Sequence, residues 1–149
     1  MKNTILGWKS NDSLDIFGQK WESESTTPKA VICLVHGFGE HSSRYEYVAK
    51  FFTDNQYAVI TYDARGHGRS AGKRGHFASY DEVLNDVDNL LKQADVNFPT
   101  LPKILYGHSM GAQIVANFAI KRNPSVKGVI LSSPFFQLGF APPAIKLFA

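Results

Sequence analysis

The sequence predicts an α/β fold in which a mostly parallel β-sheet is covered by helices on both faces. Four short apolar runs are rich in β-branched residues at odd and even positions alike, which is the pattern of a strand buried on two faces. Segments with helical spacing lie between these runs, and strands that alternate with helices are typical of a parallel sheet. The four runs are residues 30–35, 57–62, 104–106 and 129–131.

The composition fits one globular domain. The chain has 149 residues, of which 44% are hydrophobic and 19% are charged, and both fractions are typical of such domains. Its longest apolar run, residues 30–35, is far shorter than the roughly 20 residues of a membrane-spanning helix. The only cysteine, Cys33, lies inside that run and cannot form an internal disulfide. We therefore expect Cys33 to be a small buried side chain and the protein to be cytoplasmic.

The remaining elements follow from local patterns. Residues 13–21 alternate loosely between polar and apolar after an Asn11-Asp12 turn signal, which predicts an antiparallel hairpin. A helix is predicted over residues 44–52, and a second one begins at a capping box formed by Ser79 and Glu82. Their inward faces are predicted to be Tyr45, Val48, Ala49 and Phe52 in the first helix, and Val83, Val87, Leu90, Leu91 and Ala94 in the second.

The segment Gly107-His108-Ser109-Met110-Gly111 has the G-x-S-x-G pattern of a nucleophile elbow. It lies between an apolar run and the helical pattern of residues 112–122, the strand–turn–helix context that the motif requires. Glycine at both ends is expected because a Cβ there would collide with the neighbouring strand or helix. Ser109 is therefore the candidate nucleophile, and the Met110 amide at the helix start is a candidate hydrogen-bond donor.

Two further loops follow the first two parallel strands, at the edge of the sheet where sites form in this class of fold. In His36-Gly37-Phe38-Gly39 the glycines let the Phe38 amide face the elbow and complete an oxyanion hole with the Met110 amide. Loss of one such donor typically raises the activation free energy of the reaction by about 3–4 kcal/mol. His36 and His41 are predicted to be loop scaffolding, because the catalytic histidine usually follows the nucleophile in this fold.

The loop after residue 62 does not have the pattern of a phosphate or metal site. It lacks the Gly-Lys-Ser/Thr ending of a phosphate-binding loop, and Asp63, His67 and His76 do not have a recognisable metal-ligand spacing. We expect instead that Asp63 and Arg65 pair with each other and bond to neighbouring loop amides. This would brace the floor of the site.

The charge distribution does not favour a nucleic-acid partner. The net charge is +3, and residues 101–149 contain five lysines and arginines and no Asp or Glu, with His108 as their only histidine. These basic residues are scattered singly, without the interleaved aromatic residues of a nucleic-acid-binding surface.

Taken together, the motifs resemble the monoacylglycerol lipase and lysophospholipase group of the α/β-hydrolases. The resemblance is carried by the segments 36–45, 63–70 and 107–111, in that order and spacing. It implies an α/β-hydrolase core, ester hydrolysis of single-chain acyl lipids through an acyl-enzyme on Ser109, oxyanion donors at Phe38 and Met110, and neither metal nor cofactor. It also implies that residues 1–140 belong to the core and that residues 141–149 open a cap, through which the protein contacts a membrane surface transiently. Phe135, Phe136, Leu138 and Phe140 would then line the acyl channel or the underside of the cap, or be ordinary core residues.

The acid and the base of a catalytic triad are missing from the sequence. In this fold the order is Ser, then Asp or Glu, then His, and no such residue follows Ser109. We therefore expect the chain to be the N-terminal half of a longer enzyme. Alone it would be inactive and would associate through the exposed edge of its last strand. The alternatives are a peptidase or thioesterase of the same superfamily, and a noncatalytic binding module or inactive paralogue.

Overall fold

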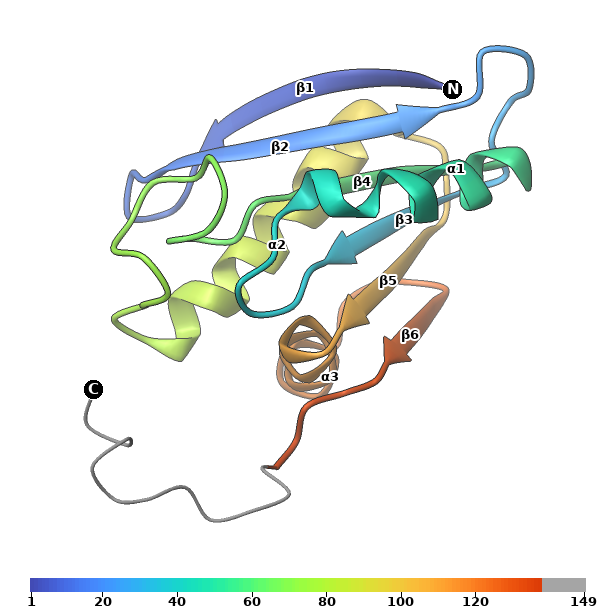
Figure 1. Ribbon diagram of the computed structural model, residues 1–149. Coiled ribbons are helices and arrows are strands. Elements are labelled where there is room, and N and C mark those ends of the chain that lie inside the picture. Colours follow the sequence, from blue (N-terminus) through green and yellow to red (C-terminus); the bar gives the residue numbers. More distant parts are fainter. Residues whose placement is uncertain (138–149) are drawn as a thin grey trace.

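A six-stranded mixed sheet organises the chain in the computed structural model, which describes residues 1–137 (Figure 1). The strand order is β1-β2-β4-β3-β5-β6. The N-terminal hairpin β1–β2 is antiparallel and joins β4 in antiparallel fashion, whereas β4, β3, β5 and β6 run parallel. The predicted fold class and hairpin are confirmed. The strands are β1 (Lys2–Lys9), β2 (Asp15–Glu22), β3 (Ala30–Val35), β4 (Tyr57–Tyr62), β5 (Lys103–His108) and β6 (Gly128–Ser132).

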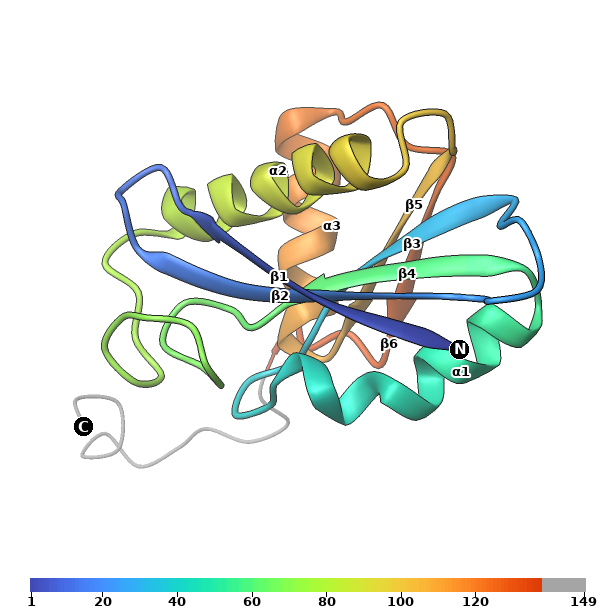
Figure 2. The ribbon, with the colours of Figure 1, turned by 90° about the horizontal axis from the view of Figure 1, so that it is seen from above.

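Helices cover both faces of this sheet (Figure 2). The helix α1 lies on one face and packs into one apolar cluster, whereas α2 and α3 lie on the other face and share a second cluster. The side of the sheet that a residue faces follows the two-residue period of a strand. In β3, Cys33 faces α2 and α3 while its neighbours Ile32 and Leu34 face α1. The helical elements are the 3₁₀ turn η1 (Ser42–Tyr45), α1 (Glu46–Asp54), α2 (Tyr80–Asn97) and α3 (Met110–Arg122).

The two central strands have the complete burial that their sequences predict. Every residue of β3 is buried, and β4 is buried from Ala58 onward. Cys33 is fully enclosed, and its burial raises the pKa of its thiol to about 12. It is therefore a small apolar side chain at neutral pH, as expected.

The strand β6 differs from this prediction. Its apolar sequence indicated burial on two faces, yet Val129, Ile130 and Leu131 are 40%, 38% and 39% exposed. In the described part of the chain β6 pairs with β5 alone and is an edge of the sheet. The apolar pattern indicates that these side chains are suited to a buried environment, whereas their actual exposure depends on which neighbouring elements cover them.

Most of the helices in the structure begin or end at slightly different residues from those predicted. The segment predicted as a helix over residues 44–52 begins as η1 and continues in α1 to Asp54. Ser79 caps α2, and its Oγ accepts a hydrogen bond from the Glu82 amide at 3.2 Å. Within residues 1–137, no helix is long and apolar enough to cross a membrane. The predicted cap at 141–149, with Leu138 and Phe140, lies outside the described residues.

Candidate active site

Ser109 occupies a strained turn between β5 and α3. Its φ of 53° and ψ of −118° lie where residues other than glycine are rarely found. The turn is held from both sides, because the Ser109 amide donates to the Ser132 carbonyl oxygen at 2.9 Å and the Ser109 carbonyl oxygen accepts from the Ala112 amide at 3.1 Å. The predicted strand–turn–helix elbow is therefore present.

The two glycines of the elbow allow a close approach of backbone segments. A Cβ added to Gly107 would lie 2.5 Å from the Cα of Ala112, and one added to Gly111 would lie 2.5 Å from the carbonyl oxygen of His36. Real Cβ atoms do not approach backbone so closely, so a larger residue at either position would push α3 away from the sheet. The predicted reason for both glycines is confirmed.

The loop after β3 lies directly against the elbow. A Cβ on Gly37 would be 3.2 Å from the Cβ of Ser109, so the two backbones meet at this point. The carboxylate of Glu40 accepts hydrogen bonds from the Gly37 amide at 2.8 Å and from the Tyr45 hydroxyl at 2.6 Å. Burial tends to raise the pKa of Glu40, but these two hydrogen bonds together with the positive charge of Arg44 hold the pKa below its usual value. The loop therefore presents Phe38 from a fixed turn.

The two predicted oxyanion donors lie in these adjoining segments. Phe38 follows Gly37, and Met110 is the first residue of α3 after Ser109. Within residues 1–137 neither of their amides donates a hydrogen bond. Free amides at a helix start and in a glycine-rich turn are able to bind an anion.

His36 connects the loops that follow β3 and β4. It is fully buried, its Nδ1 donates to the Gly37 carbonyl oxygen at 2.7 Å, and its Nε2 accepts from the Ala64 amide at 2.9 Å. Burial lowers the pKa of its imidazole, so the ring is neutral and each nitrogen has one partner. The prediction that His36 is scaffolding is confirmed. His41 is exposed, and within residues 1–137 it takes part in hydrogen bonding only through its carbonyl oxygen, which accepts from the Arg44 amide.

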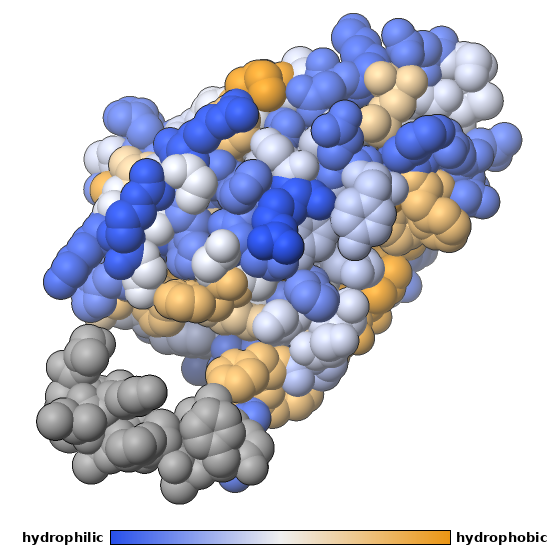
Figure 3. Space-filling view, viewed as in Figure 1, coloured by the Kyte–Doolittle hydropathy of each residue, from blue (hydrophilic) through white to orange (hydrophobic). Residues whose placement is uncertain are grey.

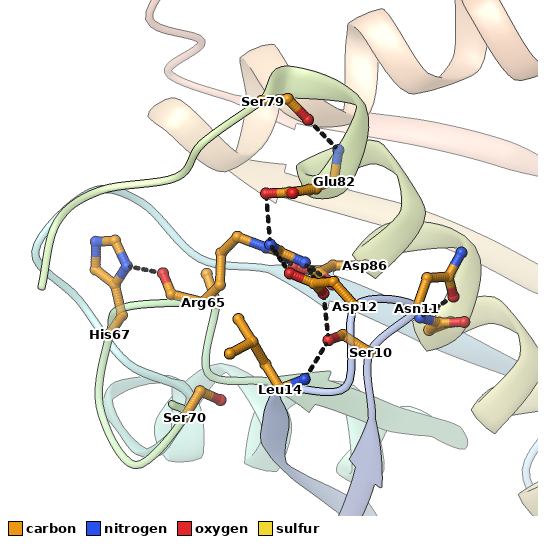
Figure 4. A network of polar contacts seen from close by, with 12 residues as sticks. Ser10, Asn11, Asp12, Leu14, Arg65, His67, Ser70, Ser79, Glu82 and Asp86 are labelled. Carbon is orange, nitrogen blue, oxygen red and sulfur yellow. Dashed lines mark hydrogen bonds and ion pairs between the residues drawn. The ribbon is translucent and has the colours of Figure 1, made fainter. Parts of the chain in front are cut away.

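The predicted pair between Asp63 and Arg65 is wrong. The two carboxylate oxygens of Asp63 accept hydrogen bonds from the backbone amides of Ser42 at 2.6 Å and Arg69 at 2.8 Å. Asp63 thus braces both loops, as expected, but its partners are backbone amides and not the Arg65 guanidinium. The Arg65 side chain instead extends toward the β1–β2 turn and α2 (Figure 4).

Arg65 is the centre of an ionic cluster that sequence reasoning missed. Its guanidinium lies 2.7 Å from Asp86, 2.8 Å from Glu82 and 3.0 Å from Asp12. The hydrogen bond from Arg65 lowers the pKa of Asp12 to about 2, whereas burial raises the pKa of Asp86. One available signal was the spacing of Glu82 and Asp86, because residues four apart share a helix face.

His67 supports the loop of the predicted oxyanion donor. Its Nδ1 donates to the Arg65 carbonyl oxygen at 3.0 Å. The edge of its ring packs against Phe38, with centroids 5.4 Å apart, and against His36 at 5.5 Å. Among residues 1–137, no three His, Cys, Asp or Glu side chains are grouped so that they could hold a metal ion.

His108 is directed to the α1 side of the elbow. Its Nδ1 lies 3.2 Å from the Ser132 hydroxyl, and its ring packs against that of Tyr45 with centroids 6.4 Å apart. These contacts agree with the prediction that His108 is not the base for Ser109. Phe135 and Phe136 are exposed, so within the described part of the chain they are not core residues.

Comparison with known proteins agrees with this geometry. The chain is 40% identical to a monoacylglycerol lipase from Mycolicibacterium smegmatis over 73% of its own length, and 36% identical to the human monoglyceride lipase over 83%. These matches span 39% and 40% of the two lipases, so the chain covers less than half the length of these relatives. The solved structure of a Paleococcus ferrophilus monoacylglycerol lipase superposes with a TM-score of 0.73 at 31% identity, covering 89% of this chain and 48% of that one.

Residues 26–149 match the family described as serine aminopeptidase, S33 (Hydrolase_4). This match covers more than half of the chain and includes the two loops and the elbow described above. The resemblance to monoacylglycerol lipases is confirmed by the relatives. The chain belongs to this family of α/β-hydrolases.

Proposed function

We propose that the protein containing this chain is a serine ester hydrolase that cleaves monoacylglycerols or lysophospholipids through an acyl-enzyme on Ser109. The observation that carries the proposal is the backbone of Ser109, whose φ of 53° places a serine on the bend between β5 and α3. Gly37, in a glycine-rich loop, lies against this serine. A strained serine in this context is the arrangement of an acyl-transfer nucleophile. The lipase relatives support the choice of substrate class.

In the proposed reaction, the Ser109 Oγ attacks the ester carbonyl carbon while its proton passes to a base. The amides of Phe38 and Met110 donate to the oxygen that becomes negative. The bond from the carbonyl carbon to the alcohol oxygen then breaks, and the alcohol leaves with the proton from the base. Water hydrolyses the acyl-enzyme by the same route in reverse, which releases the fatty acid and restores Ser109. These steps use no cofactor.

The proposal assigns the acid and base to residues that follow position 149 in a longer natural chain. No Asp, Glu or His follows Ser109 in the sequence, whereas both partners follow the nucleophile in this fold. The lipase relatives are more than twice as long as the matched region. A cytoplasmic location, which the single buried Cys33 favours, is part of the same proposal.

Labelling with a fluorophosphonate tests this assignment in the natural protein. We expect covalent modification of Ser109, located by mass spectrometry, and complete loss of labelling in Ser109→Ala. The matched control is Ser125→Ala, because Ser125 is exposed at the opposite end of the sheet. Absence of labelling under native conditions would favour the noncatalytic binding module.

A peptidase is the second candidate, because the matching family is described as serine aminopeptidase. Initial rates on a monoacylglycerol, a lysophospholipid, an acyl thioester and an aminoacyl anilide separate these activities. We expect the first two to be hydrolysed fastest. A higher kcat/KM for the anilide would assign the chain to the peptidases, and a higher one for the thioester to the thioesterases.

A further inference from the structure

The loop between β4 and α2 has a surplus of positive charge. Residues 64–79 include three arginines and one lysine and contain neither Asp nor Glu. The charge of Arg65 is neutralised by the carboxylates around it. Arg69, Lys73 and Arg74 are exposed, and within residues 1–137 none of them forms an ion pair with a carboxylate. The Arg69 guanidinium lies 4.5 Å from the centre of the Phe17 ring, and Arg74 donates to the Gly68 carbonyl oxygen, so in the described part of the chain no carboxylate neutralises these three charges.

The backbone of this loop holds these charges in a fixed arrangement. The Gly66 amide donates to the Ala71 carbonyl oxygen at 2.9 Å, and the Gly75 amide donates to the Gly66 carbonyl oxygen at 3.1 Å. The Arg69 amide donates a hydrogen bond to the Asp63 carboxylate at 2.8 Å. A loop that is already ordered loses little conformational entropy when it binds.

Exposed aromatic side chains adjoin the basic residues. Phe38 is 64% exposed and Phe77 is 37% exposed. The loop touches Phe38, because a Cβ on Gly75 would lie 3.3 Å from the Phe38 ring. Figure 3 shows hydrophilic side chains gathered over the region of this loop, with hydrophobic atoms directly beneath them. The end of the loop that follows Lys73 and Arg74 therefore reaches Phe38, and Gly37, the neighbour of Phe38, lies against Ser109.

We propose that Arg69, Lys73, Arg74 and Phe77, together with Phe38, form a docking surface for an anionic lipid bilayer. Basic side chains attract anionic headgroups, and aromatic rings gain free energy at the boundary with the acyl chains. A soluble phosphate would also attract the basic side chains, but it has no apolar part that Phe38 and Phe77 could contact. This surface lies outside the predicted cap at 141–149. Its purpose, bringing the elbow to lipid substrates, rests on the proposed function, but docking itself requires no hydrolysis.

Vesicle flotation tests the charge component of this surface. The natural protein is used with Ser109→Ala, so that no lipid is consumed, and with vesicles of phosphatidylcholine alone or with about a third phosphatidylglycerol. We expect binding to the anionic vesicles, weakened by high salt. The triple variant Arg69→Gln, Lys73→Gln, Arg74→Gln should bind on the order of 100-fold more weakly, about five-fold per charge. Equal binding to both kinds of vesicle would overturn the proposal.

The matched control removes three exposed lysines elsewhere, by Lys92→Gln, Lys121→Gln and Lys127→Gln. It has the same net charge as the triple loop variant and should keep most of the binding. An equal loss in both triples would show that net charge alone matters, and would overturn the docking surface.

Two further measurements examine the apolar part and the choice of partner. Phe77→Ser should weaken vesicle binding several-fold while leaving its salt dependence unchanged, because it removes apolar burial without removing charge. Competition by millimolar inorganic phosphate, or tighter binding to an oligonucleotide than to vesicles, would overturn the lipid assignment. Failure of fluorophosphonate labelling would refute the proposed hydrolase and leave vesicle binding unaffected, so the two proposals fail separately.

Discussion

The loops that follow β3 and β4 lie side by side but are stabilised by different interactions. The loop at 36–45 is braced by the neutral imidazole of His36 and by hydrogen bonds to Glu40. The loop at 63–79 is anchored by Arg65 among three carboxylates. The neutral imidazole and the Glu40 carboxylate lie next to the candidate nucleophile, whereas the ion pairs of Arg65 lie on the side of the β1–β2 turn and α2. The difference indicates that salt and pH should affect the two loops separately.

The largest expected effect is that of Arg65→Met. The variant leaves the carboxylate of Asp86, which is buried, without its counter-ion. Loss of one partner of a buried ion pair typically costs about 3–5 kcal/mol, and we expect this loss in the free energy of unfolding by urea. Arg69→Met is the matched control, because Arg69 is exposed and has no carboxylate partner within residues 1–137. Similar stabilities of the two variants would contradict the ionic anchor.

His36→Leu should have the next largest effect. It leaves the Gly37 carbonyl oxygen and the Ala64 amide without a side-chain partner in buried surroundings. A buried polar group without a partner costs about 1–3 kcal/mol, so we expect the two groups together to cost about 2–6 kcal/mol. His36→Asn can restore only the contact with Gly37 and should recover part of the loss. If leucine were tolerated at no cost, the histidine bridge would not stabilise the loops.

Ser79→Ala should destabilise the start of α2 by about 1 kcal/mol, the usual value for an N-cap side chain. The hydroxyl oxygen of Ser79 accepts a hydrogen bond from the Glu82 amide, and the carboxylate of Glu82 also forms an ion pair with Arg65. The loss should therefore be smaller in the Arg65→Met background than in the wild type. A double-mutant cycle of unfolding free energies measures this coupling, and strict additivity would show that the cap and the ionic cluster are independent.

The smallest expected effects are those of acidification on the free energy of unfolding. Acidification should weaken the interactions of the two loops in different pH ranges. Burial lowers the pKa of His36 from 6.5, so the unfolded state binds its proton first and stability falls as the pH drops below 6.5. Arg65 lowers the pKa of Asp12 from 3.8 to about 2, so that contribution is complete above 3.8 and is lost toward pH 2. Burial raises the pKa of Asp86, which opposes the second loss.

Urea midpoints across this pH range distinguish the two groups. His36→Leu should remove the pH dependence just below 6.5, and Asp12→Asn should remove part of that below 3.8. If His36→Leu changed only the strongly acidic range, the neutral state of His36 would be refuted.

Local patterns predicted the elbow and most of the elements. Gly107 and Gly111 were predicted from backbone sterics alone, and their surroundings confirm it. The edge position of β6 agrees with the exposed edge expected for this chain alone, but its apolar sequence indicated burial on two faces, because an apolar strand looks the same in the centre of a sheet and at its edge. The Asp63–Arg65 pair was wrong because Asp63 accepts from the amides of Ser42 and Arg69, while the Arg65 guanidinium binds three other carboxylates. These competing donors cannot be ranked without the folded backbone.

The sequence by itself determined the alternation of strands and helices, the turn at Ser109 and the position of the glycines, because these depend on residues close together in the chain. Only the tertiary structure decided that Arg65 joins Asp12, a residue 53 positions away, and that Phe38 packs against His67. It also decided that Val129 to Leu131 are exposed. Such contacts depend on which surfaces the folded sheet brings together. The chemistry of a side chain is compatible with many partners, and the folded backbone determines which of them lie within reach.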